Sequence, residues 1–110
     1  MSYPMMFAAL VAAHALCDYP LQGDFLAKGK NRNTAFPGMP WWQIMAAHAA
    51  IHGGAVGWIT GVWWLGVLEF GAHFLTDDLK CRGRIGFQQD QAVHLACKAL
   101  WVAIAIWVAQ

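Results

Sequence analysis

Apolar residues fall into four runs along this chain, and each run ends at a proline, a glycine or a group of charged residues. Pro20 stops the first run, and Gly61 marks a turn between the second and the third. The pattern predicts four helices, at about 4–20, 41–60, 62–80 and 87–108. Residues 21–40 are polar and rich in glycine and proline, which predicts one long loop.

The composition changes this picture from a soluble bundle to a membrane protein. The chain has 110 residues, enough for one domain, and is 59% hydrophobic and 12% charged. No Lys, Arg, Asp or Glu lies between Arg32 and Glu69. One helix of that length would exceed a hydrocarbon core of about 30 Å, so we expect two spans joined near Gly61. The prediction is an all-α, integral membrane four-helix bundle in a single transmembrane domain.

Basic residues are concentrated in alternate loops, which predicts an orientation. Six of the seven lie in the loops after the first and third runs: Lys28, Lys30, Arg32, Lys80, Arg82 and Arg84. The positive-inside rule then places both loops in the cytoplasm and the termini outside, in a multi-pass protein of the inner (cytoplasmic) membrane. The N-terminus has no basic segment typical of a signal peptide, so we expect the first helix to remain in the mature protein.

Charge and cysteine content exclude two classes of protein. The net charge is +1 and no basic stripe is present, which excludes nucleic-acid binding. Cys17, Cys81 and Cys97 are far apart and form no CxxC motif, so neither a disulfide framework nor a thiolate zinc site is expected. We interpret them as small buried apolar residues.

Ionisable residues inside the apolar runs are costly in a membrane and indicate function. All five histidines take part in i, i+4 spacings, which place side chains on one helix face. The groups are His14 with Asp18, His48 with His52, Glu69 with His73 and Asp77, and Asp90 with His94 and Lys98.

Counting residues from the cytoplasmic end of each run sorts these side chains into three layers. Asp18, Asp77 and Asp90 lie about one turn in, at roughly 5 to 6 Å. The second layer, about two turns in, contains four imidazoles: His14, His48, His73 and His94. The third layer lies about three turns, or roughly 17 Å, from the cytoplasmic end, and contains His52, Glu69 and Lys98.

Imidazole and carboxylate groups on the inner faces of a bundle suit a divalent transition metal. Zinc is the first choice, with iron or manganese as alternatives, and either one ion or two ions sharing carboxylates fit the pattern. The candidate ligands are His14, Asp18, His48, His52, Glu69, His73, Asp77, Asp90 and His94. The competing interpretations are a proton or ion relay and a purely structural network of polar contacts.

Three further features have simpler interpretations. Lys98 is expected to pair with Glu69, so that both buried charges are compensated. Asp78 points away from Asp77 and is expected at a solvated helix end or beside Lys80 or Arg82. The glycines of the second run and the turn indicate close helix packing, unless Gly53-Gly54 ends that helix early: Gly53, Gly54, Gly57 and Gly61.

Four motifs together resemble a bacterial and phage integral-membrane family of unknown function. They are HxxxDxxLQ from His14 to Gln22, HxxxH from His48, HxxxDxxK from His73 to Lys80, and DQxxH from Asp90. The resemblance covers nearly the whole chain and implies a small multi-span protein, without supplying a reaction. A looser similarity links the chain to membrane-bound metal-dependent hydrolases, as an analogy only.

The most economical function consistent with these patterns is metal-dependent hydrolysis of a lipid, or of a lipid-linked phosphate or ester. Asp18, Asp77 and Asp90 are the candidate catalytic residues, as ligands or general bases. The candidate substrate contacts are Gln22, Lys80, Arg82 and Gln91, with Lys80 and Arg82 placed to hold an anionic headgroup. The alternatives are a relay or transporter component and a non-enzymatic membrane factor; a homodimer is plausible for so small a chain.

Overall fold

The computed structural model describes residues 1–110, and the chain is all-α, with five helices and no strand. The helices are α1 (Tyr3–Asp18), α2 (Gly23–Gly29), α3 (Trp41–Thr60), α4 (Trp63–Cys81) and α5 (Phe87–Val108). The four apolar runs correspond to α1, α3, α4 and α5, so the predicted helices are confirmed with bounds that differ by two residues at most.

The prediction that residues 21–40 form one loop is wrong, because α2 occupies part of this segment. Gly23, at φ +64°, lets the chain turn sharply after α1, so that α2 is bent by 83° from it. Asp24 in the first turn of α2 and Lys28 in its last turn suit the helix dipole. A short helix therefore lies among the turn-forming residues of this segment.

Local signals define the main helix ends. Ser2 caps α1, where its side chain accepts a hydrogen bond from the backbone N–H of Met5 at 3.3 Å. Gly61 ends α3 at φ +71°, as its position between the two apolar runs predicts.

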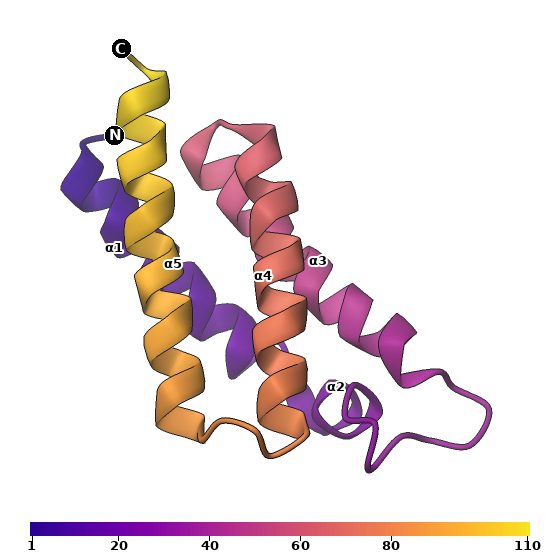
Figure 1. Cartoon of the computed structure of the whole chain (residues 1–110). Coiled ribbons are helices and arrows are strands. Elements are labelled where there is room, and N and C mark those ends of the chain that lie inside the picture. Colours follow the sequence, from indigo (N-terminus) through magenta and orange to yellow (C-terminus); the bar gives the residue numbers. More distant parts are fainter.

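The four long helices form a bundle in which α1 packs against α3 and α5, and α4 packs against the same two helices. Figure 1 shows α4 and α5 running side by side, while α1 and α3 are inclined to them. Both termini and the Gly61 turn lie toward one end of the bundle, and α2 and the two basic loops lie toward the other. This grouping of the loops agrees with the predicted alternation.

The interior of the bundle is more polar than that of a soluble protein. Thirteen buried residues are polar or charged and ten are hydrophobic, whereas large apolar side chains cover the surface. Trp58, Trp63 and Trp107 are 89%, 76% and 74% exposed. The apolar part of the core joins α1, α3, α4 and α5 and includes Leu10, Val56, Leu65 and Trp101.

One helix, α5, is long and apolar enough to cross a membrane by itself. The bent pair of α1 and α2 is also long and apolar enough if the two helices form one broken span. The helices α3 and α4 have 20 and 19 residues, about the length of a membrane core. Histidines in α3 and several charged residues in α4 interrupt their apolar sequence and lower its hydropathy. A four-span topology therefore stays a prediction.

Glycines bring α3 and α4 into close contact, and α3 continues unbroken through Gly53 and Gly54. A Cβ atom on Gly53 would lie 2.6 Å from the Gly66 carbonyl oxygen, and one on Gly66 would lie equally close to Gly53. The close packing predicted for the glycines applies to Gly53 and Gly57, but a Cβ on Gly54 or Gly61 would meet nothing within 4 Å.

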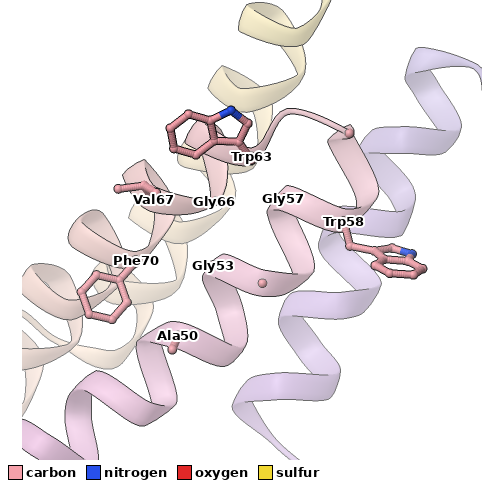
Figure 2. A pocket seen from close by; sticks show the side chains of 10 residues that line it. Ala50, Gly53, Gly57, Trp58, Trp63, Gly66, Val67 and Phe70 are labelled. Atoms are coloured by element: carbon pink, nitrogen blue, oxygen red, sulfur yellow. The ribbon is translucent and has the colours of Figure 1, made fainter.

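Two cavities open on the surface of the bundle. An apolar groove of about 620 Å³ borders the glycines and includes Trp58, Trp63 and Phe70 (Figure 2). A smaller cavity of about 340 Å³ lies between the start of α1 and the side of α5. Neither is lined by any of the ionisable residues singled out from the sequence.

Candidate metal centre

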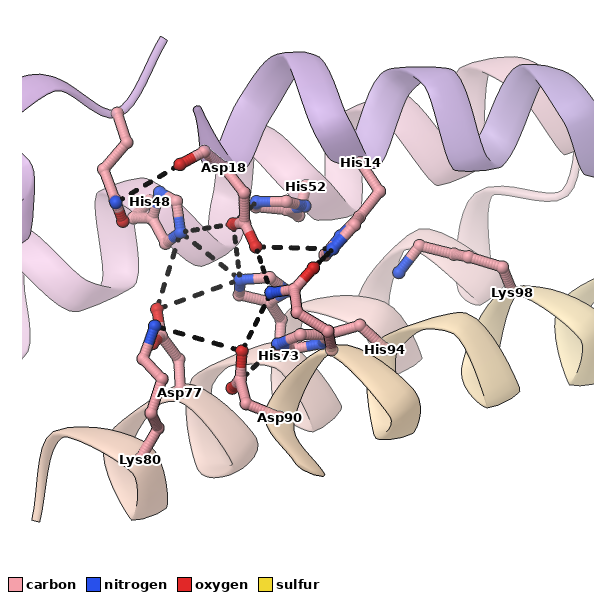
Figure 3. A network of polar contacts seen from close by, with 12 residues as sticks. His14, Asp18, His48, His52, His73, Asp77, Lys80, Asp90, His94 and Lys98 are labelled. Carbon is pink, nitrogen blue, oxygen red and sulfur yellow. Dashed lines mark hydrogen bonds and ion pairs between the residues drawn. The ribbon is translucent and has the colours of Figure 1, made fainter. Parts of the chain in front are cut away.

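Side chains from α1, α3, α4 and α5 converge on one buried polar cluster inside the bundle (Figure 3). All five histidines belong to it, and none is more than 4% exposed: His14, His48, His52, His73 and His94. The i, i+4 spacings bring them together, because each helix turns the same face inward. The predicted convergence of these histidines is therefore confirmed.

Asp18, at the end of α1, lies at the middle of this cluster. Its Oδ1 atom is 2.8 Å from His52 Nε2 and 3.2 Å from His48 Nε2. The Nε2 atom of His73 lies 3.7 Å from the same oxygen and 3.3 Å from His48 Nε2. One carboxylate oxygen thus faces three imidazole nitrogens from two other helices.

These separations fit the ligand set of a transition metal. A tetrahedral zinc ion with bonds of about 2.0 Å holds its ligand atoms about 3.3 Å apart. The four residues Asp18, His48, His52 and His73 each offer one ligand atom, and these atoms all lie within 4.8 Å of one another. The buried groups can therefore hold a metal ion, and their nitrogen and oxygen donors favour zinc, iron or manganese over calcium or magnesium.

The second oxygen of Asp18 faces a different set of groups. Asp18 Oδ2 lies 3.3 Å from His14 Nε2 and accepts a hydrogen bond from the Gln91 side-chain amide at 3.2 Å. The same amide donates to Asp90 Oδ2 at 3.1 Å, and Asp90 Oδ1 lies 3.2 Å from His94 Nε2. Two further groups could hold an ion: Asp18 with Asp90 and His94, and Glu69 with His73 and His94.

Glu69 is neutralised by protein groups. Lys98 Nζ donates to Glu69 Oε1 at 2.6 Å, and the Trp101 indole donates to Oε2 at 2.7 Å. The predicted pairing of Lys98 with Glu69 is therefore confirmed. Glu69 Oε1 also lies 3.5 Å from His73 Nδ1, a buried nitrogen without a hydrogen-bond partner, and Nε2 of that ring faces Asp18. Metal-binding histidines usually donate the ring nitrogen that does not bind the metal to a carboxylate, and Glu69 is the carboxylate beside that nitrogen of His73.

Asp77 is held by two lysines at the edge of the cluster. Lys30 donates to Asp77 and to Gln22, and Lys80 Nζ lies 3.1 Å from Asp77 Oδ1. The other oxygen of Asp77 is 3.5 Å from His48 Nε2. Asp77 therefore borders the ligand atoms, while its charge is compensated by protein cations.

Sequence reasoning missed Lys30, which is only 3% exposed although we assigned it to a polar loop. The adjacent pair Asp77-Asp78 could have indicated a buried lysine, because two adjacent buried carboxylates require cations from elsewhere in the chain. Arg32 is the second such cation: it donates to both oxygens of Asp78, and its guanidinium lies 4.1 Å from the centre of the Trp41 ring. Asp78 is thus buried, and the predicted contact with Arg82 is also present at 3.3 Å.

The candidate substrate contacts all have partners within the chain. Gln22 donates to the Asp18 carbonyl oxygen at 3.3 Å, and Gln91 binds His14, Asp18 and Asp90. Lys80 also lies 3.9 Å from Asp90. The side chains of Lys80 and Arg82 are 26% and 35% exposed, at the basic end of the bundle.

The three predicted layers are wrong in two details. His52 lies in the same shell as His48, where its ring stacks on His73 with centroids 3.7 Å apart. Asp18 lies among the imidazoles instead of in a carboxylate layer with Asp77 and Asp90. Because α1 and α3 are inclined to α4 and α5, equal residue counts along the helices do not give equal depths (Figure 1).

The cysteines take no part in the cluster. All three thiols are free, and burial raises the pKa of the Cys81 thiol. Cys17 is buried, as predicted, whereas Cys81 and Cys97 are half-buried. The candidate ligand groups are thus made of histidine and carboxylate alone.

No family model, curated protein or solved structure matches this chain. The family resemblance of the four motifs therefore stays an expectation.

Proposed function

We propose that this protein is a multi-span membrane protein that binds a divalent transition metal and uses it to hydrolyse a phosphate or carboxylic ester of a lipid. The observation that carries the proposal is the convergence of three imidazole nitrogens on one oxygen of Asp18. Zinc is the metal proposed first, because histidine nitrogen and carboxylate oxygen are common zinc ligands.

The distribution of polar and apolar side chains supports a membrane location. Ionisable groups fill the interior, and exposed tryptophan, leucine and phenylalanine side chains cover the outside. Water would penalise this arrangement, whereas a bilayer solvates the apolar surface and favours contacts among polar groups inside. The basic loops at one end would then lie at the cytoplasmic headgroups.

The residues of the polar cluster have three different roles in this proposal. Asp18, His48, His52 and His73 hold the ion, and Glu69 orients the His73 ring. Such an ion lowers the pKa of water and polarises a phosphoryl or acyl oxygen. Asp77 is the carboxylate assigned to proton transfer, since it lies beside the ligand atoms but outside the four-residue set.

Position along the bundle supports a lipid substrate. Lys80 contacts both Asp77 and Asp90 and is partly exposed at the end where the basic loops lie. An anionic headgroup attracted to Lys80 and Arg82 would reach the edge of the centre, while its acyl chains remain in the hydrocarbon region.

The first experiment is elemental analysis of the detergent-purified protein beside His48→Ala. We expect at least one zinc, iron or manganese ion per wild-type chain, and less metal in the variant at unchanged helix content. Wild-type protein that binds none of these metals after equilibration with each would overturn the proposal.

A second experiment tests hydrolysis. Mixed micelles containing phosphatidic acid and, separately, p-nitrophenyl laurate serve as phosphate-ester and carboxylic-ester probes. Metal-loaded protein should release phosphate or nitrophenol, and Asp77→Asn should lower the rate by about 100-fold or more while retaining the metal. Metal-loaded protein that cleaves neither probe would contradict the hydrolase assignment and leave the metal site intact.

A further inference from the structure

We infer that the centre binds two divalent transition-metal ions, with Asp18 as the carboxylate that bridges them. This inference rests on the proposed metal-binding function and adds a second site to it. Asp18, His48, His52 and His73 would bind the first ion, and Asp18, Asp90 and His94 would bind the second.

The two oxygens of Asp18 face different groups, as a bridging carboxylate requires, and Oδ2 shares its Gln91 partner with Asp90 of the second set. Oδ1 faces the imidazoles of α3 and α4, whereas Oδ2 faces His14 on α1 and Gln91 on α5. The two sets adjoin each other, because the rings of His73 and His94 stack with centroids 4.1 Å apart. In two-metal hydrolases the ions lie about 3.5–4 Å apart, a spacing that a shared carboxylate can span.

Charge also favours a second ion beside Asp90. Asp18 and Asp90 accept hydrogen bonds from the same amide nitrogen of Gln91, so two buried carboxylates meet at one neutral group. Asp18 has no lysine or arginine within 4 Å, and Asp90 has only Lys80 at 3.9 Å. Buried carboxylates require compensation by cations or metal ions. A metal bound to both would supply it.

The remaining candidate group, Glu69 with His73 and His94, is less suitable for the second ion. Lys98 and Trp101 already bind both oxygens of Glu69, and the charge of Lys98 balances that of Glu69. The Nε2 atom of His73 is directed to the first set. Glu69 is therefore a positioning residue here.

Metal counting distinguishes the second site from the first. After equilibration with Zn²⁺ and removal of unbound metal, the wild type should retain two ions per chain. His94→Ala should retain one, because His94 is assigned to the second ion and not to the first, and the control Asp24→Asn, at an exposed residue of α2, should still retain two. Circular dichroism verifies helix content in each variant.

Each possible number of metal ions per chain tests a different part of the inference. One ion in the wild type would overturn the second site and leave the proposed function standing, whereas no ion would overturn both. Two ions in His94→Ala would overturn the ligand assignment, and so would fewer than two in Asp24→Asn, because a residue outside the cluster would then control the count. Electron paramagnetic resonance of the Mn²⁺-loaded wild type needs no variant: an exchange-coupled spectrum is expected, and the spectrum of isolated ions only would contradict a carboxylate-bridged pair.

Discussion

His52 on α3 lies 2.8 Å from the carboxylate of Asp18 on α1, although 34 residues separate them in the chain. Both side chains are almost fully enclosed, and the contact joins the first helix of the bundle to the third element along the chain. Asp18 thereby becomes the residue on which the polar cluster depends, since it also contacts His14 and His48.

Replacing Asp18 by Asn should abolish tight metal binding. The amide keeps the shape of the side chain but removes the negative charge and one acceptor oxygen, so we expect Zn²⁺ affinity to fall by at least about 100-fold. The matched control is Asp24→Asn, because Asp24 is exposed on α2 and forms no ion pair. Competition with a chromogenic chelator measures both affinities, and equal losses in the two variants would contradict the assignment.

Removing the metal should destabilise the protein. An ion that binds only the folded chain adds about 2.7 kcal/mol at a free concentration 100 times its Kd. Treatment with a chelator should therefore lower the thermal midpoint in detergent, and Zn²⁺ but not Mg²⁺ should restore it. A midpoint that is the same with chelator and with Zn²⁺ would show that the folded state gains nothing from the ion.

The buried pair of Glu69 and Lys98 should show strong energetic coupling. Glu69→Gln or Lys98→Met alone leaves one buried charge without its partner, which typically costs about 3–5 kcal/mol. The double variant removes both charges and should lose clearly less stability than the sum of the two single losses. Chemical denaturation of the four proteins gives this double-mutant cycle, and additive losses would argue against a buried ion pair.

The crossing of α3 and α4 should not tolerate a side chain at Gly66. Gly66→Ala would place its Cβ 2.6 Å from the Gly53 carbonyl oxygen, so we expect a destabilisation of about 1–3 kcal/mol. Gly71→Ala is the control on the same helix, since its Cβ would meet nothing within 4 Å and alanine favours helix formation. If both variants unfold at the wild-type denaturant concentration, the helices do not approach as closely as described.

The predicted orientation can be tested by cysteine labelling. In a variant without the three native cysteines, Gln110→Cys should react with a membrane-impermeant maleimide in intact bacterial cells. Arg84→Cys, at the basic end, should react only after the cells are permeabilised. The opposite labelling pattern would reverse the topology, and labelling of both positions in intact cells would argue against cytoplasmic basic loops.

Local patterns in the sequence were sufficient to predict the four long helices, the Gly61 turn and the grouping of the basic loops. They were also sufficient to identify the histidines as one inward-facing set, because an i, i+4 spacing places side chains on the same helix face whatever the helix packs against. The pairing of Lys98 with Glu69 followed from the cost of leaving either charge buried alone.

Tertiary structure alone decided which groups meet. The inclination of α1 and α3 brought His52 into contact with Asp18, and the sharp bend into α2 carried Lys30 into the interior beside Asp77. Such contacts depend on the angles between helices, which one-turn spacings along each helix do not encode. The sequence thus determined which side chains face inward, and the packing of inclined helices determined which of them lie close enough together to hold an ion.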